Sequence, residues 1–383
     1  MKLGAKKIKW NHYINYIVIG AFLILFTILS LTGGTKSSTE YLLEKLAISI
    51  TLAVSLSIVV GFLGELSLGH AGFMCVGAYV GGKLASMWDA GADNPLILVL
   101  TLFIGGAVAA VFGFIIGLPA LRLKGDYLAI VTLAFGEIVR SVFLNTSKES
   151  FGGPLGLRTP RYDSATLFIY GFLVVLLCLL VTQNIIRSKH GRAITSIRDN
   201  EIAARATGIN VTKYKLIAFM VSAFFAGVAG VLYSHSNYTV QSQNFDYNYS
   251  IEILVMVVLG GMGSINGSII AASLITFLNV KLATVLTGDL AVLKDLIYAL
   301  ILIALVIYNN APALKSFREK YNFKALLKKL IPHHDEPSAR RDDEGEWSRV
   351  PTKIDMNEVL SLDIYVTESV TNPDKPKDSK GDK

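Results

Sequence analysis

Residues 96–117 read LILVLTLFIGGAVAAVFGFIIG, a run of 22 positions without a charged side chain or a proline. An α-helix rises about 1.5 Å per residue, so a helix of this length is about as long as the hydrocarbon core of a bilayer is thick, roughly 30 Å. The run therefore predicts a helix that spans a membrane.

Runs of the same kind recur along the body of the chain. Together with 96–117 they give ten candidate spans, the others lying at 13–31, 41–60, 70–87, 127–145, 165–186, 214–234, 250–263, 267–287 and 290–309. Four lysines precede the first run, at positions 2, 6, 7 and 9. Because that run is about as long as a spanning helix, we expect a retained anchor with a cytoplasmic N-terminus and not a cleaved signal.

The charge of the loops indicates how many of these runs cross the membrane. The loop at 187–213 is the most basic one, and basic loops stay in the cytoplasm. The run at 250–263 is short, and reads either as a half-span or as a full crossing. Counting it as a crossing leaves this loop and both termini in the cytoplasm, so we expect ten transmembrane helices, with eight as the other even number.

The composition argues against a soluble domain and against nucleic-acid binding. The 383 residues are 52% hydrophobic and 17% charged, whereas soluble domains carry about 25% charged residues. The net charge of +7 falls within residues 1–310, because the tail at 311–383 has 14 Lys and Arg and 14 Asp and Glu. We expect a cytoplasmic N-terminus at 1–12, an all-α transmembrane domain at 13–310 and a largely disordered, charged cytoplasmic tail at 311–383.

The sequence offers no catalytic or metal-binding pattern. Residues 77–83 match the G-x-x-x-x-G-K part of a phosphate-binding loop, but Leu84 stands where the magnesium-binding hydroxyl belongs. The glycines at 77, 81 and 82 are better explained by close helix packing. Cys75 and Cys178 lie within apolar runs and are expected to be small core residues. We therefore expect neither catalysis nor a nucleotide site on this chain.

Two glycine-rich interruptions divide apolar runs in the two halves of the chain. The first, at 61–73, contains Gly64, Glu65, Gly69 and His70, and the second, at 260–267, contains Gly261 and Gly263. Broken backbone at membrane depth is tolerated where it is buried in protein or lines a water-filled path. Paired breaks at corresponding positions indicate a transport route. The alternative is an ordinary cytoplasmic turn at each site.

Ionisable side chains within the apolar runs are the other candidates for such a route. Glu137 lies about ten residues into the run at 127–145, and Arg140 follows on the same helix face at i+3. An unpaired charge that far into a membrane-spanning helix costs free energy. The two side chains are therefore expected to form a structural ion pair or to border a polar pathway. The candidate pathway residues are Glu65, His70, Asp126, Glu137 and Arg140.

The loop at 187–213 is too polar to enter lipid, yet it is rich in helix-forming residues. Small side chains at Ala203 and Ala204 would let a partner approach closely, and Gly208 is a natural helix stop. We expect a docking helix for a cytosolic subunit, with a helix that rests on lipid headgroups as the alternative. The candidate coupling residues are Arg198, Glu201, Ala203, Ala204, Arg205 and Gly208.

Four segments together carry a resemblance to a known family. They read GHAGFMCVGAYVGG from 69, GLPALRLKGDYLAIVTLAFGEIVR from 117, IRDNEIAARATGINVTKYKLIAF from 197 and LGGMGSINGSIIAA from 259. Over about residues 40–310 the chain resembles the LivM-type permeases of bacterial high-affinity branched-chain amino acid ABC importers. The resemblance implies the fold of the larger ABC importers, typified by the cobalamin transporter, in the bacterial cytoplasmic (inner) membrane.

The resemblance also implies the partners. They are a second, LivH-like permease, two cytosolic ATPases that hold ATP and Mg²⁺, and an extracytoplasmic substrate-binding protein, with no cofactor on this chain. Residues 201–208 resemble the family's ATPase-coupling motif, Glu-Ala-Ala followed four residues later by Gly. Ala203, Ala204 and Gly208 match, whereas Ile202 stands where the motif has Glu, and Glu201 comes one position early.

The expected function is therefore that of a permease subunit for branched-chain amino acids. Within the same family, a permease for urea or short amides is an alternative. A second alternative is a carrier that works alone on an ion gradient, because several ionisable residues lie in or near apolar runs, namely Glu65, Glu137, Arg140, Glu252 and Lys281.

Overall fold

The computed structural model describes residues 14–32, 36–88, 94–121, 123 and 125–285, and five further positions, 296, 299, 300, 303 and 307. Residues 1–311 form one compact unit, and residues 312–383 form a second that lies outside the described residues. The expectations for the N-terminus at 1–12, for most of the run at 290–309 and for the charged tail at 311–383 concern residues outside the described part.

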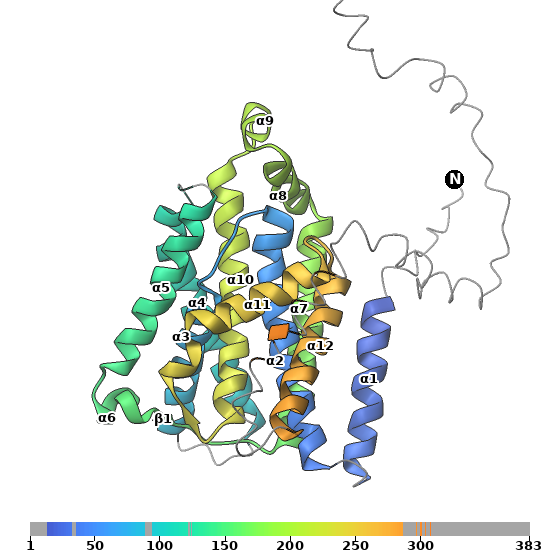
Figure 1. Cartoon of the computed structure of the whole chain (residues 1–383), viewed down its shortest axis with the longest axis vertical. Helices are drawn as coiled ribbons and strands as arrows, with labels where there is room; N and C mark the ends of the chain where they lie inside the picture. The colour runs from blue at the N-terminus through green and yellow to red at the C-terminus, as the bar shows by residue number, and fades with distance from the viewer. Residues whose placement is uncertain are drawn as a thin grey trace, which may run out of the picture. The chain divides into compact units, whose positions relative to one another are not determined.

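The described part is a bundle of long helices joined by short helical and extended pieces (Figure 1). Its two β-strands, β1 (Leu157–Arg158) and β2 (Thr239–Val240), form one antiparallel pair in which Leu157 faces Val240. The helices are α1 (Ile14–Leu31), α2 (Ser37–Ser57) with its π-helical continuation η2 (Ile58–Leu63), α3 (His70–Met87), α4 (Pro95–Ala120), α5 (Asp126–Leu144), α6 (Lys148–Phe151), η3 (Gly153–Leu155), α7 (Ser164–Arg187), α8 (Lys189–Asp199), α9 (Glu201–Ala206), α10 (Val211–Ser236), η4 (Ser242–Phe245), α11 (Tyr247–Gly260) and α12 (Ile265–Val285).

Each expected run up to 267–287 coincides with a helix in the described residues. Six helices there are long and apolar enough to cross a membrane: α2 with η2, α4, α5, α7, α10 and α12. The chain is thus a polytopic membrane protein. α11 has 14 residues, which corresponds to about 21 Å and is shorter than a bilayer core. The count of ten spans, and the crossing at 250–263, stay predictions.

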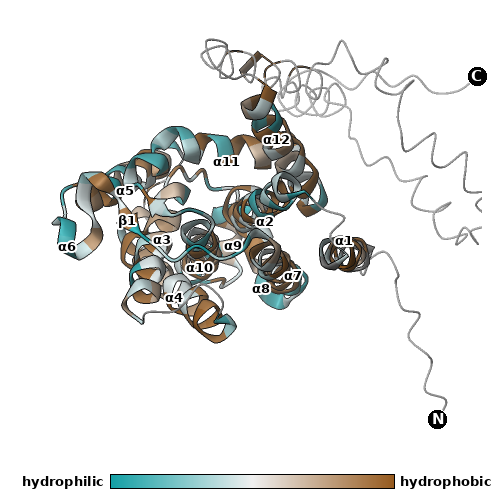
Figure 2. Cartoon of the chain, turned by 90° about the horizontal axis from the view of Figure 1, so that it is seen from below, coloured by the Kyte–Doolittle hydropathy of each residue, from teal (hydrophilic) through white to brown (hydrophobic). Residues whose placement is uncertain are grey.

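Helix α10 packs closely against α3 and α4 because small residues line the contacts (Figure 2). A Cβ added at Gly77 of α3 would lie 2.1 Å from the carbonyl oxygen of Gly227, and one added at Gly230 would lie 2.0 Å from that of Met74. The prediction that glycines near position 77 serve helix packing is confirmed. Cys178 and Cys75 are buried, as expected of core residues.

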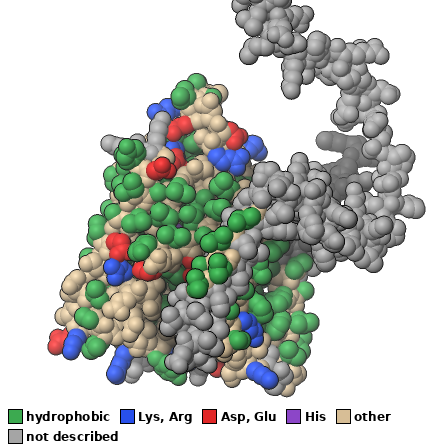
Figure 3. Space-filling view, in the orientation of Figure 1, with side chains coloured by type: hydrophobic (Ala, Val, Ile, Leu, Met, Phe, Trp, Pro, Cys, Tyr) green, Lys and Arg blue, Asp and Glu red, His purple; other side chains and the backbone are tan. Residues whose placement is uncertain are grey.

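Helix α2 packs against α7, α10 and α12. α1 lies beside α7, where the hydroxyl of Tyr16 donates to the carbonyl oxygen of Leu179 at 3.5 Å and the rings of Phe22 and Phe172 are 5.4 Å apart. On the face seen in Figure 3, hydrophobic side chains cover much of the middle of the described surface. Charged side chains lie mostly toward the two ends of this face. A surface that faces lipid is expected to be apolar in the middle and charged at both ends.

Candidate functional site

Helices α8 and α9 lie at one end of the bundle (Figure 1). α8 begins at a turn where the hydroxyl of Ser188 accepts from the backbone N–H groups of His190 and Gly191, at 3.1 and 3.4 Å. Its apolar face is buried through Ile194 and Ile197. The helix therefore lies against the ends of the long helices and leaves its polar face outward.

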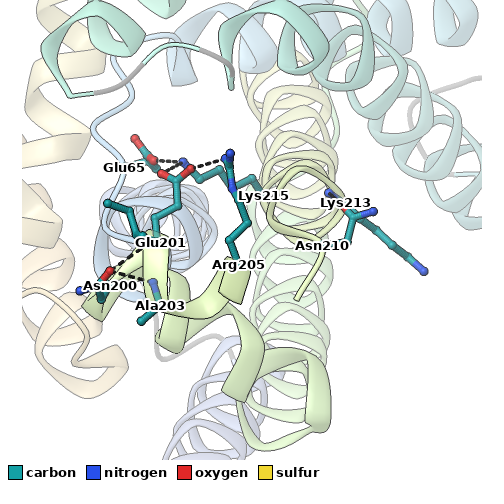
Figure 4. Close-up of polar contacts among 9 residues, drawn as sticks. Glu65, Asn200, Glu201, Ala203, Arg205, Asn210, Lys213 and Lys215 are labelled. Atoms are coloured by element: carbon teal, nitrogen blue, oxygen red, sulfur yellow. Dashed lines mark hydrogen bonds and ion pairs between the residues drawn. The ribbon is translucent and has the colours of Figure 1, made fainter. Parts of the chain in front are cut away.

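The short helix α9 is fixed at both ends by its own sequence. Asn200, in an extended conformation, accepts with Oδ1 from the backbone N–H groups of Ile202 and Ala203, both at 3.0 Å (Figure 4). This is the geometry of a strong N-cap. Gly208 follows the helix with φ of +85°, a backbone conformation that favours glycine. The prediction that Gly208 stops this helix is confirmed.

An ion cluster joins α9 to the interior of the bundle (Figure 4). The ammonium of Lys215, in α10, contacts Oε1 of Glu65 and lies 3.2 Å from Oε2 of Glu201. Glu201 also pairs with Arg205, whose Nη2 lies 2.6 Å from Oε1. The side chain of Lys215 is only 2% exposed, so its charge depends on these carboxylates. The cluster connects α9 with the residue that follows the break in α2.

Arg198, the last basic residue of α8, reaches the same break. Its Nη1 donates to the carbonyl oxygen of Gly61 at 3.2 Å, while Nη2 and Nε bind Asp199 at 3.1 and 3.2 Å. A Cβ added at Gly64, whose φ is +79°, would lie 2.6 Å from Cγ of Arg198. Glycine at position 64 therefore adopts the left-handed backbone conformation without strain and also leaves room for the side chain of Arg198.

The two glycine interruptions meet at this place. A Cβ added at Gly61 would lie 2.8 Å from the backbone nitrogen of Gly263, and Gly261 and Gly263 both have positive φ, at +90° and +83°. Gly69, by contrast, packs against α5, where an added Cβ would lie 2.4 Å from the carbonyl oxygen of Thr132. The breaks at 61–64 and 261–263 and the end of α8 thus form one junction.

The candidate pathway residues are not gathered in one place. Glu65 belongs to the ion cluster, whereas His70 is buried in the bundle with Nε2 2.9 Å from the hydroxyl of Ser55. Asp126 is the exposed first residue of α5. Glu137 and Arg140 form the expected ion pair at 2.8 Å, with side chains 30% and 29% exposed. Whether these residues line a route stays a prediction.

The coupling candidates divide between a buried and an exposed face of α9. Glu201 turns toward Lys215 and Ala204 is buried, whereas Ala203 and Arg205 are exposed. Ile202, in the position of the motif's Glu, is 77% exposed. The acidic side chain of this segment therefore binds its own chain, and an apolar side chain stands at the helix surface instead.

Two residues that matter here were missing from the sequence-based set. Lys215 was overlooked, although a lysine inside an apolar helix signals a buried partner. Asn200 was overlooked as well, although asparagine directly before a helix is a common cap. The arrangement as a whole can transmit a displacement of α9 to the junction of the two breaks, because ion pairs and backbone contacts connect them.

The comparisons with known proteins agree with this architecture. Residues 38–306 match the family model described as "Branched-chain amino acid transport system / permease component". The chain is 39% identical over 260 residues to the high-affinity branched-chain amino acid transport system permease protein LivM of Salmonella typhimurium. That alignment covers 60% of this chain and 60% of the relative, so the chain matches about three fifths of that protein's length.

More distant permeases are also similar. A probable branched-chain amino acid transport permease protein LivM of Methanocaldococcus jannaschii is 27% identical over 203 residues, or 50% of this chain and 58% of that protein. The ribose import permease protein RbsC of Escherichia coli is 24% identical over 314 residues, or 76% of this chain and 92% of that protein. No solved structure gave a significant match. The family model covers most of the helical bundle, including α8, α9 and both glycine breaks, and the chain therefore belongs to the branched-chain amino acid transport permease family, as a LivM-type member.

Proposed function

We propose that this chain is a transmembrane subunit of an ATP-driven importer for branched-chain amino acids. In this proposal, cytosolic ATPases bind α9 and move it, and the movement reaches the helix breaks and opens a route across the membrane. The names of the relatives support the substrate class, since LivM relatives are described as branched-chain amino acid permeases. The chain itself hydrolyses nothing in this proposal, and ATP and Mg²⁺ belong to the partners.

The observation that carries the proposal is the connection from α9 to the breaks. The exposed surface of α9 offers Ile202 and Ala203 to a partner, while its inner surface holds Lys215 through Glu201. Lys215 binds Glu65 directly after the break in α2. A force on the outer surface therefore has a short path of charge-assisted contacts into the bundle.

The assembly in this proposal has four kinds of component. This chain pairs with a LivH-like permease, and a LivH protein of Salmonella typhimurium is itself 24% identical to it over 293 residues. Two ATPases bind from the cytoplasm and a substrate-binding protein binds from outside. The proposed location is the bacterial cytoplasmic membrane, with ten spans and both termini in the cytoplasm, because the most basic loop contains α8 and α9.

The test is a single substitution on the exposed surface of α9. Ile202→Arg places a positive charge where we propose the ATPase docks and where the family's motif has Glu, and it should abolish ATP-dependent leucine uptake by the whole importer in proteoliposomes. It should also abolish copurification of the ATPases. The free energy of unfolding of the variant should stay within about 0.5 kcal/mol of that of the unaltered chain. Substitutions of exposed residues that make no special contact usually change stability by no more than this.

The matched control is Leu155→Arg, which changes an equally large apolar residue that is 64% exposed near β1, at the other end of the bundle (Figure 1). This variant should retain its ATPases. If Ile202→Arg also retains them and transports leucine at the normal rate, α9 is not the docking element. An importer that takes up urea or ribose but not leucine would keep the coupling scheme and remove the substrate assignment.

A further inference from the structure

An apolar groove of about 570 Å³ lies on the surface formed by α3, α4 and α5. The described residues that line it are all apolar, and they include Val80 of α3, Ile115 of α4 and Ala134 of α5. On α5 the lining extends from Val131 to Phe143, which corresponds to about 18 Å along the helix. One leaflet of a bilayer contributes about half of the hydrocarbon core, or roughly 15 Å. The groove is therefore long enough to hold an acyl chain of one leaflet.

A second cavity, of about 610 Å³, lies at the end of α3 that is remote from α8 and α9 (Figure 1). Three cations line it, namely Lys83 of α3, Lys148 of α6 and Arg158 of β1. Glu149 is the one carboxylate among its described lining residues. Within the described part of the chain, no carboxylate lies at ion-pair distance from any of the three cations. The cavity therefore carries an excess of positive charge.

Backbone contacts fix the shape of this basic cavity. A Cβ added at Gly152, whose φ is +82°, would lie 2.0 Å from the carbonyl oxygen of Gly156. One added at Gly156, whose φ is +81°, would lie 2.6 Å from that of Val240, in β2. The ammonium of Lys83 donates to the carbonyl oxygen of Glu149 at 3.1 Å and so holds α6 against α3. The cavity is thus part of the fold and does not require a ligand to form.

The apolar groove and the basic cavity adjoin one another on two elements. On α3, Val80 lines the groove and Lys83 lines the cavity, and residues three apart share a helix face. On α6, Phe151 lines the groove, whereas Lys148 and the following Gly152 line the cavity. The groove therefore ends where the cluster of cations begins.

Exposed aromatic side chains place the basic cavity at the level of the lipid headgroups. Trp88, directly after α3, is 42% exposed, and Tyr238, directly before β2, is 70% exposed. Both lie next to segments that line the cavity, which include Ser86 and Thr239. Tryptophan and tyrosine are enriched where a membrane meets water. Basic pockets at this depth bind anionic headgroups.

One class of ligand suits the groove and the cavity together. A free phosphate would use only the cations, and a neutral hydrocarbon would use only the groove. An acidic segment of a protein would meet the cations but would not extend along an apolar groove at membrane depth, because its backbone polar groups would lose their hydrogen bonds. A phospholipid with a net negative charge has both the anionic headgroup and the acyl chain.

We propose that this surface is a binding site for an anionic phospholipid, with the phosphate-bearing headgroup among Lys83, Lys148 and Arg158 and an acyl chain in the groove of α3, α4 and α5. Given the cytoplasmic position proposed for α8 and α9, the lipid belongs to the outer leaflet. The site goes beyond the proposed function and is independent of the transported substrate.

The experiment measures lipid binding by the full-length chain in detergent, by the rise in melting temperature with added lipid and by native mass spectrometry. Phosphatidylglycerol should stabilise the chain at concentrations at which phosphatidylcholine, which has no net charge, does not. Lys148→Gln and Arg158→Gln should each weaken phosphatidylglycerol binding about fivefold, the contribution expected of one cation near a membrane surface. Lys148→Arg keeps the charge and should bind as the unaltered chain does.

Lys36→Gln is the matched control for Lys148→Gln. Both lysines are exposed, and Lys36 lies directly before α2 and does not line the cavity. This variant should bind phosphatidylglycerol as the unaltered chain does. Without added lipid, all these variants should melt at the temperature of the unaltered chain, because exposed side chains contribute little to stability.

A further variant tests the apolar groove. Ala134 is exposed, so Ala134→Phe places a ring in the groove without disturbing the bundle. It should weaken binding of phosphatidylglycerol and leave any binding of inorganic phosphate unchanged. Gly20→Phe is the control, because no atom lies within 4 Å of a Cβ added at Gly20 of α1, and it should bind the lipid normally.

The inference is overturned if phosphatidylglycerol stabilises the chain no more than phosphatidylcholine does, or if Lys148→Gln and Lys36→Gln bind it equally well. Stabilisation by inorganic phosphate that equals that by the lipid, unchanged in Ala134→Phe, would assign the cavity to a free anion. Loss of an extracytoplasmic partner from Lys148→Gln, with unchanged lipid binding, would assign it to a protein. None of these results bears on α9, whose role is read from ATPase copurification with Ile202→Arg.

Discussion

Lys215 is the residue on which the connection between α9 and the helix break depends. Replacing it with Met leaves the carboxylates of Glu65 and Glu201 near one another without their shared cation. Removing one partner of a buried ion pair costs about 3 kcal/mol or more, because the remaining charge is not compensated. We expect Lys215→Met to lower the stability of the chain by roughly this amount, measured by thermal unfolding in detergent.

A double substitution provides the control for that prediction. Glu65→Gln together with Lys215→Met removes one carboxylate along with the cation, and should recover part of the lost stability. A coupling energy between the two positions of about 1 kcal/mol or more is expected of residues in direct contact. If the effects of the two substitutions simply add, the ion pair does not exist in the protein.

Gly208 allows a second prediction at the scale of one residue. No atom lies within 4 Å of a Cβ added there, so a side chain meets no obstacle and only the backbone conformation opposes it. Gly208→Ala should cost about 1–2 kcal/mol, the strain of a left-handed conformation in an L-residue. Hydrogen exchange of the α9 amides should become faster in Gly208→Ala. It should do so less in Gly208→Asn, because asparagine tolerates this conformation. Unchanged exchange in Gly208→Ala would contradict the role of Gly208 as the stop of α9.

At the scale of whole helices, the contact of α3 with α10 leaves no room for a side chain at Gly77. Gly77→Leu would force a side chain into the backbone of Gly227, and should destabilise the bundle by at least about 3 kcal/mol. The yield of monodisperse protein after purification measures this effect. Gly20→Leu on α1 is the matched control, since a Cβ at Gly20 meets no atom within 4 Å, and it should purify normally. Equal yields of the two variants would show that α3 and α10 are not closely packed.

Helix positions could be predicted from the sequence because hydrophobic length is a local property. The runs at 96–117 and 214–234, for example, became α4 and α10 with only small changes at their ends. Two of the boundaries that differ lie at the glycine breaks: the run at 41–60 continues as the π-helix η2 to Leu63, and α11 ends at Gly260, before the end of the run at 250–263. At these two places the backbone departs from regular α-helix.

The candidate site could be predicted only in its local parts. The end of α9 at Gly208 and the pair of Glu137 with Arg140 involve residues close in sequence, and both were predicted correctly. The pairing of Lys215 with Glu65 joins residues 150 positions apart. No periodicity or spacing in a single sequence carries that information, because it arises from the packing of α10 against the break after α2.

At the scale of the whole molecule, we propose that the chain is a conduit that depends on partners for energy. The alternative of a carrier that works alone drew on ionisable residues in apolar runs. Of these, Glu65, Glu137 and Arg140 have charged partners within the chain, which is what a structural role requires.

The most direct test is leucine accumulation in proteoliposomes that contain the full-length chain, with and without the partner permease, the ATPases and the binding protein. We expect accumulation only when all partners and ATP are present, and no accumulation by the chain alone under a proton or sodium gradient. Accumulation of leucine by the chain alone, without ATP, would contradict the proposed function.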